Sequence, residues 1–188
     1  MNERKFVESI KVFLESVKIA DNIIIDAHKE IPYIQENTEY DLCFKPKENQ
    51  NPDTKFETDL LVYEQKSNVI KPRIIIEAKF SEISTHDAIT YSYKAQSHKN
   101  VTPFLRYGIM LGNRGHHPLP GRLFRHGSNF DFMISFKNSE LTEEEKKSFV
   151  KLIKKEIEYS QQMEEMLFNT RSKNRKHYFL LQKELRLE

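Results

Sequence analysis

Two carboxylates and one lysine flank apolar stretches in the first half of the chain. Asp59 precedes the apolar run at residues 60–63, and Glu77 and Lys79 follow three consecutive isoleucines at residues 74–76. Residues two apart in a strand share a face, so Glu77 and Lys79 point to the same side. If the two stretches pair as strands, Asp59 comes close to Glu77. Two carboxylates can bind a divalent cation through oxygen, and the ammonium can orient water or stabilise developing negative charge.

The motif formed by Asp59 and the tripeptide Glu77-Ala78-Lys79 resembles the PD-(D/E)XK nuclease superfamily. The tripeptide alone is weak evidence, because it often arises by chance. It becomes informative here because it follows an isoleucine-rich stretch, and because an apolar stretch that begins at Asp59 precedes both. The resemblance covers residues 1–136 and implies a restriction-endonuclease-like α/β fold, with an αβββαβ core and a mixed central sheet flanked by helices. Residues 137–188 match nothing in this family. They are expected to form a helical C-terminal extension, packed on the core or at a dimer interface.

The resemblance implies hydrolysis of phosphodiester bonds, with Mg²⁺ as the metal and Mn²⁺ as its substitute. Asp59, Glu77 and Lys79 are the expected catalytic residues. The expected metal ligands are the two carboxylates and the backbone carbonyl of Ala78. A bound metal lowers the pKa of water and screens the charge on the phosphate, while Lys79 positions or activates the water. We therefore expect a Mg²⁺-dependent endonuclease of the type II restriction kind, acting on double-stranded DNA and favoured as a homodimer because one site cuts one strand.

Other functions remain open from the sequence. A repair, recombination or methyl-directed nuclease of the same superfamily is the nearest alternative. Gln96 suits an exonuclease-type branch, but its spacing to a following tyrosine does not match. A non-catalytic nucleic-acid-binding domain would keep the fold without cutting, and a protein-interaction domain would use the helical C-terminus. In either of these, Asp59 would cap a turn, and Glu77 and Lys79 would form an ordinary solvent-facing pair.

Two further aspartates compete with Asp59 for the metal. Asp53 follows Pro52 and so matches the literal family pattern better, but the polar tract at residues 45–55 is typical of a loop. A metal ligand needs a rigid element, and the apolar run after Asp59 provides one. We therefore favour Asp59. Asp41 remains an alternative that replaces or assists it, although a surface strand residue is its simpler interpretation.

Helical spacing of apolar residues predicts a first helix over residues 3–20. Glu8 and Glu15 lie on the polar face of this helix, and Glu3 lies nearer the apolar stripe. A first-helix acid reaches the metal in some relatives of the superfamily, but we leave these three out of the site. The other expected elements are an interrupted strand at 23–34 with a break at 26–30, strands at 38–44, 56–63, 73–79, 104–111 and 130–136, a helix at 85–99 capped by Thr85, a helix at 142–167 with a Thr142–Glu145 capping box, and an apolar-striped segment at 177–187.

Positive side chains gather in the irregular segment at residues 112–128, which also holds four glycines and two prolines. This composition is typical of a flexible or finely shaped loop. Its cations suit phosphate oxygens, and an arginine can read a guanine edge. A solvated loop, a zinc site and a histidine base are the alternatives, and zinc is disfavoured because a nearby cysteine is lacking. The predicted DNA-binding residues are Lys94, Lys99, Arg106, Arg114, His116, His117, Arg122, Arg125 and His126.

Bulk composition bounds the remaining possibilities. The 188 residues suffice for one domain with a core, and 38% hydrophobic residues with only 5 glycines argue against general disorder. A net charge of +2 does not by itself indicate a nucleic-acid-binding protein. The single cysteine, Cys43, cannot form an internal disulfide and is expected to be a buried strand residue, with a catalytic thiol as the alternative. The N-terminus reads as an amphipathic segment rather than a signal peptide, and no apolar run approaches the ~20 residues of a membrane span, so we expect a cytoplasmic protein.

Overall fold

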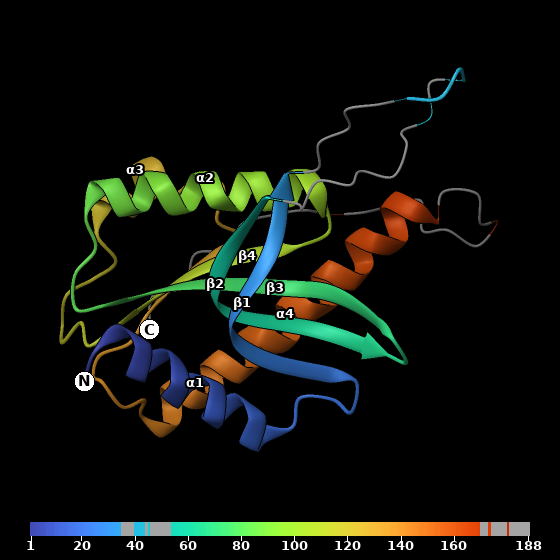
Figure 1. The fold of residues 1–188 in the computed structure, drawn as a ribbon. Helices are drawn as coiled ribbons and strands as arrows, with labels where there is room; N and C mark the ends of the chain where they lie inside the picture. The colour runs from blue at the N-terminus through green and yellow to red at the C-terminus, as the bar shows by residue number, and fades with distance from the viewer. Residues whose placement is uncertain (35–39, 44, 46–53, 170–172, 174–179, 181–188) are drawn as a thin grey trace.

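A mixed five-stranded sheet lies between two layers of helices in the computed structural model, which describes residues 1–34, 40–43, 45, 54–169, 173 and 180 (Figure 1). This confirms the expected α/β class with a mixed sheet flanked by helices. The elements are α1 (Glu3–Val17), β1 (Ile23–Ile34), β2 (Thr54–Lys66), β3 (Val69–Phe80), α2 (Thr85–Val101), β4 (Arg106–Gly112), α3 (Gly121–His126), β5 (Phe132–Ser135) and α4 (Glu143–Phe168).

The strands lie in the sheet in their chain order, β1-β2-β3-β4-β5. β1, β2 and β3 form an antiparallel meander, whereas β4 is parallel to β3 and β5 is parallel to β4. The backbone pairing between β2 and β3 extends as far as Leu60 opposite Ile76. Asp59 and Glu77 therefore lie just beyond the last backbone pair of these two strands.

Helices cover both faces of the sheet. α1 and α4 lie on one face, and α2 and α3 lie on the other (Figure 1). Ile74 and Ile76 pack towards α1 and α4, whereas Ile75 packs towards α2, and all three are fully buried. The expectation of a strand buried on both faces is confirmed.

α4 belongs to the same core as the N-terminal helix. Its residues Phe149, Ile153 and Ile157 pack in one buried cluster with Phe6 of α1, and the ring of Phe149 lies 5.3 Å from that of Phe136. The expected capping box is present, because Thr142 accepts from the Glu145 amide and Glu145 bonds back to the Thr142 amide. The described part of the C-terminal extension thus packs on the core. The segment expected at 177–187 lies outside the described residues.

The structure corrects the prediction that residues 26–30 interrupt the first strand. β1 is continuous over this stretch, and its pairing with β2 runs through Ala27 opposite Leu60 and Lys29 opposite Thr58. Backbone hydrogen bonds to β2 therefore hold the polar residues in the strand. His28 has a positive φ of 55°, so the backbone is irregular at that one position.

The strand expected at 38–44 is also wrong for the residues that the structure describes there. Asp41 closes a turn, because its Oδ1 accepts from the backbone amides of Cys43 and Lys45 at 2.8 and 2.9 Å. Aspartate commonly stabilises turns in this way. Cys43 is exposed rather than buried. Asp53 lies outside the described residues.

Two boundaries on the α2 side differ from expectation. Ser84, not Thr85, caps α2, since its Oγ accepts from the Asp87 amide at 3.0 Å and Asp87 bonds back to the Ser84 amide at 2.8 Å. The segment at 112–128 was expected to be irregular throughout, but it contains the short helix α3. Leu123 of α3 is fully buried against the α2-side core, and this burial anchors the helix.

Candidate active site

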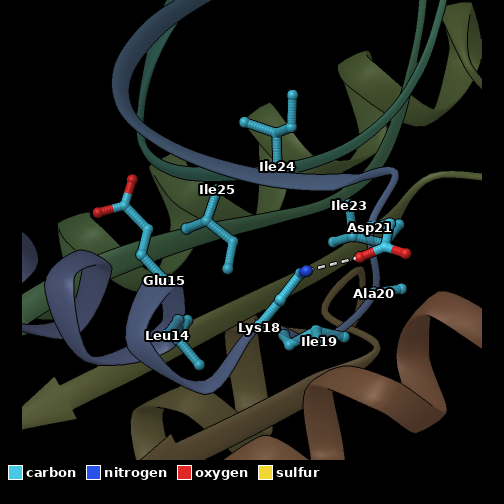
Figure 2. A pocket seen from close by; sticks show the side chains of 9 residues that line it. All are labelled: Leu14, Glu15, Lys18, Ile19, Ala20, Asp21, Ile23, Ile24 and Ile25. Carbon is cyan, nitrogen blue, oxygen red and sulfur yellow. Dashed lines mark ion pairs between the residues drawn. The ribbon is translucent and has the colours of Figure 1, made fainter.

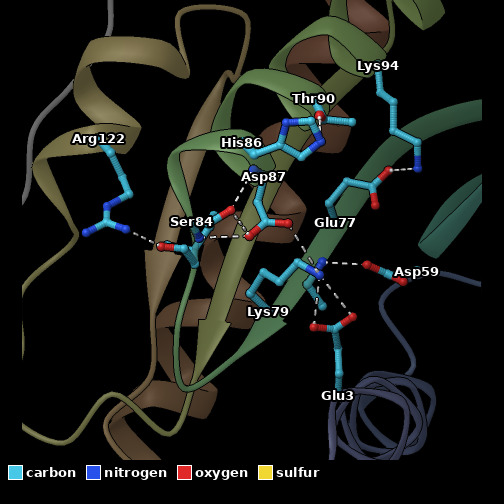
Figure 3. Close-up of polar contacts among 12 residues, drawn as sticks. Glu3, Asp59, Glu77, Lys79, Ser84, His86, Asp87, Thr90, Lys94 and Arg122 are labelled. Carbon is cyan, nitrogen blue, oxygen red and sulfur yellow. Dashed lines mark hydrogen bonds and ion pairs between the residues drawn. The ribbon is translucent and has the colours of Figure 1, made fainter.

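β2 and β3 bring Asp59, Glu77 and Lys79 to one face of the sheet. Leu61 and Ile75, each two residues from one of these acids, pack in the core beneath α2. Because strand side chains alternate, all three polar side chains also face α2, as Figure 3 shows. Asp59 lies within β2 rather than at its start. The structure thus brings together the three expected catalytic side chains.

The carboxylate of Asp59 continues the sheet where the backbone pairing stops. Its Oδ2 accepts a hydrogen bond from the Ala78 amide at 2.7 Å. The N–H and C=O groups of one strand residue point to the same edge, so the Ala78 carbonyl also faces the edge that Asp59 occupies. The three expected metal donors are therefore neighbours at the β2–β3 edge.

Glu77 is almost completely buried, with 1% of its surface exposed. Its Oε1 accepts from the Tyr107 hydroxyl at 2.6 Å and lies 3.3 Å from the Lys94 ammonium. Burial raises the pKa of Glu77 from 4.5 to about 7, with a further increase from the charge of Asp59, while Lys94 and Tyr107 oppose the change. Near neutral pH, both protonation states of this carboxyl are therefore populated.

Lys79 lies in a cluster of acidic and aromatic groups. Its Nζ is 3.3 Å from Glu3 Oε2, 4.0 Å from Asp87 Oδ1 and 5.2 Å from the centre of the Tyr91 ring. Burial by itself would lower the pKa of Lys79, but Tyr91 and Glu3 outweigh it, and the pKa is raised above its ordinary value. The raised pKa favours the charged ammonium form of Lys79 at neutral pH.

The sequence analysis missed several members of this cluster. Helical spacing shows which face Glu3 occupies but not how far its side chain reaches, and no local pattern in the sequence points to Tyr107. Lys94 was assigned to DNA, yet its ammonium contacts Glu77 and the Glu57 carbonyl. For α2, the sequence does contain a usable pattern. One helix face is shared by Asp87, Tyr91 and Lys94, because they are spaced four and three residues apart.

Two of the expected DNA-binding residues are engaged in ion pairs away from this cluster. Arg106 is 7% exposed, and its guanidinium lies 2.7 Å from Glu156 of α4 and 3.2 Å from Asp131. α4 covers the opposite face of the sheet, so this side chain points away from Glu77. Lys99 is at the far end of α2, 2.7 Å from Asp131. Neither position supports a role in binding DNA next to the candidate site.

The positively charged segment at residues 112–128, called the basic segment from here on, lies beside the end of β3. Arg114 donates to the carbonyl of Ser81. Arg122, labelled in Figure 3, donates to the carbonyl of Ile83 at 2.9 Å. Ser81 and Ile83 follow shortly after Lys79, so these contacts hold the segment close to the cluster. The remaining members are exposed; they are His116, His117, Arg125 and His126.

The donor set at the β2–β3 edge suits a hydrated divalent cation. Among the described residues, no group of three or more His, Cys, Asp or Glu side chains is arranged to hold a metal ion. Mg²⁺ needs few protein ligands because it keeps several waters. The hydrogen bonds above use Asp59 Oδ2 and Glu77 Oε1, which makes Asp59 Oδ1, Glu77 Oε2 and the Ala78 carbonyl the donors that a cation would use. The residues fit the expected metal.

A shallow pocket at the other end of α1 is separate from this site. It is lined by apolar residues such as Leu14 and Ile25 and is bordered by the Lys18–Asp21 ion pair of 2.8 Å (Figure 2). Glu3 lies at the opposite end of the same helix, and a helix rises about 1.5 Å per residue. The pocket therefore does not extend to Lys79.

Within the described ranges, no helix combines the length and apolar character needed to cross a lipid bilayer. Comparisons of the chain with protein-family models, curated proteins and solved structures gave no match.

Proposed function

We propose that this protein is a metal-dependent endonuclease that cuts double-stranded DNA, with Asp59, Glu77 and Lys79 as its catalytic residues. The observation that carries the proposal is their convergence on one face of the sheet, with Asp59 hydrogen-bonded to the residue between the other two. The element order α1, β1, β2, β3, α2, β4 also supports it. That order matches the αβββαβ core of the PD-(D/E)XK nucleases, whose sequence motif Asp59 and the Glu77-Ala78-Lys79 tripeptide resemble.

In this mechanism, the chain's own residues position the reactants. Asp59, Glu77 and the Ala78 carbonyl would hold Mg²⁺ or Mn²⁺, which would supply a water of lowered pKa and screen the phosphate charge. The Ala78 amide fixes Asp59, and Tyr107 fixes Glu77, so both carboxylates keep their orientation. The Lys79 ammonium orients the attacking water and stabilises negative charge on the phosphate. Its raised pKa favours this charged form at neutral pH.

A non-catalytic DNA-binding domain is the second candidate. The Asp59–Ala78 hydrogen bond and the Lys79–Glu3 ion pair each contribute to the fold without any chemistry. Within the nuclease proposal, a type II restriction enzyme is the first choice, and a repair or recombination nuclease is the alternative. All of these would present the exposed basic residues of the 112–128 segment to phosphate groups.

Plasmid cleavage tests the proposal directly. Wild type is expected to nick and linearise supercoiled DNA with Mg²⁺ and to lose this activity with EDTA. Asp59→Asn keeps an acceptor for the Ala78 amide but removes the charge, and Lys79→Ala removes the ammonium. Each should reduce the rate by about 10²–10³-fold, while Lys147→Ala on the exposed face of α4 should cut normally. If the two site variants cut as well as wild type, the proposed catalysis is wrong.

Removing one exposed cation of the basic segment should weaken DNA binding without regard to sequence. Arg125→Ala is expected to reduce affinity several-fold and to lower the slope of log affinity against log salt by about 0.9, the effect of one phosphate contact. Fluorescence anisotropy without Mg²⁺ measures both quantities. Lys154→Ala on α4 is the control, and its slope should equal that of wild type. An unchanged slope for Arg125→Ala would assign this residue to ordinary solvated surface.

A further inference from the structure

The sheet divides at the candidate site. β2 pairs with β3 only as far as Leu60, but its pairing with β1 continues to Thr54. Residues 28–34 and 54–59 therefore extend from the sheet as a two-stranded ribbon, which we call the β1–β2 arm. Asp59 is the β2 residue of this arm that lies nearest the sheet. Because a two-stranded ribbon is only marginally stable by itself, contacts outside the ribbon are needed to fix the position of Asp59.

The arm turns from one face of the sheet towards the other. Ala27 packs against the core cluster on the α1 side, whereas Ile31, four residues later, packs against the cluster on the α2 side. Residues four apart in a regular strand share a face, so the strand rotates between these two positions. His28, with its positive φ of 55°, lies in this interval. The rotation brings the end of β1 beside α2 (Figure 1).

Two side chains of α2 hold the arm, one on each of its strands. Lys94 Nζ donates to the Glu57 carbonyl of β2 at 3.2 Å. His98 Nε2 lies 3.2 Å from the Ile31 carbonyl of β1. A carbonyl oxygen only accepts, so Nε2 carries the proton in this second bond. Because both acceptors are backbone atoms, the two bonds fix the main chain of the arm.

Aromatic rings complete the contact between α2 and the arm. Tyr33 and Phe56, one from each strand, stack with their ring centres 3.6 Å apart. The His98 ring meets these two rings edge-on at 6.2 and 5.8 Å, and Lys94 Nζ lies 5.1 Å from the centre of the Phe56 ring. His98 is 1% exposed, and burial lowers its pKa to about 4, so its ring carries no charge at neutral pH.

The same two side chains also support Glu77 on β3. Lys94 Nζ is 3.3 Å from Glu77 Oε1, and Figure 3 draws this contact. His98 stacks against Tyr107 with the ring centres 5.7 Å apart, and the Tyr107 hydroxyl donates to the same oxygen of Glu77 at 2.6 Å. Lys94 and His98 thus connect the strand that carries Asp59 with the strand that carries Glu77.

We propose that Lys94 and His98 are positioning residues, which hold the β1–β2 arm on α2 and so set the separation of the Asp59 and Glu77 carboxylates. This role rests on the proposed function, because it takes the two acids as ligands of a divalent cation. Mg²⁺ requires nearly ideal octahedral geometry at about 2.0–2.1 Å, whereas Ca²⁺ accepts irregular geometry at about 2.3–2.6 Å. A carboxylate pair that is no longer held should therefore discriminate less between these two cations.

Cation binding by the whole chain without DNA tests this role. Mn²⁺ is the probe, because electron paramagnetic resonance measures the free ion directly, and Mg²⁺ and Ca²⁺ are titrated as its competitors. His98→Phe keeps an aromatic ring but loses the donor. It should weaken Mn²⁺ and Mg²⁺ binding at least about tenfold, the usual effect of losing a group that supports a metal ligand. Ca²⁺ binding should fall by less than about threefold.

Two matched variants control for the change at His98. His98→Gln keeps an N–H donor, so it should restore most of the wild-type affinity for Mg²⁺. Asn100→Ala changes an exposed position of the same helix and should bind all three cations like wild type.

Lys94→Met separates the positioning role from a simple effect of charge. Removal of the ammonium also removes a positive charge that competes with any cation at Glu77. This effect is the same for Mg²⁺ and Ca²⁺, which carry equal charge, so it cancels in the ratio of their affinities. The preference for Mg²⁺ over Ca²⁺ should therefore fall in Lys94→Met as it does in His98→Phe. An unchanged ratio would show that Lys94 serves only as a counter-ion.

Hydrogen exchange of the backbone amides measures the arm without any metal. In His98→Phe, amides of residues 29–34 and 54–58 should exchange about fivefold faster, as expected for the loss of one hydrogen bond. Amides of β3 and β4 should keep their wild-type rates, which also shows that the variant is folded. Wild-type exchange throughout the arm would overturn the proposal.

The binding data distinguish failure of this proposal from failure of the proposed function. Mn²⁺ binding that depends on Asp59 but is unchanged in His98→Phe would overturn the positioning role alone. If wild type binds no Mn²⁺, or if Asp59→Asn binds it equally well, the metal site is wrong and the positioning role is wrong with it.

Discussion

Glu77→Gln is expected to slow Mg²⁺-dependent DNA cleavage strongly and, in the same protein, to stabilise the fold at pH 8. Glutamine keeps the oxygen that accepts from the Tyr107 hydroxyl but carries no charge for a cation. Loss of one of the two carboxylates should lower the cleavage rate by about 10³-fold. The gain in stability arises because an ionised carboxylate is costly in this buried position.

The sign of the pH dependence follows from the raised pKa of Glu77. Its pKa is 4.5 in the unfolded chain and about 7 in the folded one, so its contribution to stability is fully present below pH 4.5 and is lost as the pH rises through 7. A difference of that size corresponds to about 3 kcal/mol. Glutamine cannot ionise, so the variant does not lose folding stability in this way as the pH rises. The stability of Glu77→Gln relative to wild type should therefore increase between pH 5 and pH 8.

Urea unfolding at pH 5 and pH 8 measures this change, and plasmid cleavage measures the rate. Glu158→Gln removes an equal charge from an exposed position of α4 and should change neither quantity. If the stability difference between Glu77→Gln and wild type is the same at both pH values, ionisation of Glu77 does not destabilise the fold as described. If Glu77→Gln cuts DNA like wild type, Glu77 is not a metal ligand.

Arg106→Met is expected to destabilise the protein by about 3–5 kcal/mol, because it leaves Glu156 buried without its cation. Glu156 is 4% exposed, and burial already raises its pKa despite the opposing charge of Arg106. Protonation can neutralise this carboxyl in the variant. The loss of stability should therefore be smaller at pH 5 than at pH 8.

The double variant Arg106→Met, Glu156→Met supplies the control, because apolar replacements of a buried ion pair are often neutral or stabilising. It should recover most of the stability lost by Arg106→Met. DNA affinity, measured at a temperature where each protein is folded, should match wild type in both variants. A specific loss of affinity in Arg106→Met would instead support the role in DNA binding that the sequence predicts for Arg106.

Local sequence patterns predicted the elements well where apolar residues decide the structure. The isoleucines at 74–76 predicted a strand buried on both faces, and the Thr142–Glu145 pair marked the start of α4. The errors came where partners distant in sequence decide. β1 stays extended through residues 26–30 because β2 pairs with it, and α3 forms because Leu123 reaches a core that the local sequence does not reveal.

The same distinction applies to the candidate site. The spacing of Glu77 and Lys79 predicted their shared face, because the period of a strand is a local property, whereas Asp59 joins them only through the pairing of β2 with β3. The partners of these residues could not be predicted in this way. Tyr107 reaches Glu77 from β4, a strand 30 residues away, and Arg106, next to it in sequence, faces the other side of the sheet.

The packing of α4 bears on any attempt to shorten this protein. Residues 1–136 contain every catalytic side chain proposed above, and on that ground they resemble a detachable module. A polypeptide ending there would lack Phe149 and Ile153, which belong to the same buried cluster as Phe6 and Phe136, and the remainder of that cluster would become exposed to water. Truncation at this point would yield an aggregating fragment instead of a minimal enzyme, and a fusion partner is better joined where it leaves α4 attached.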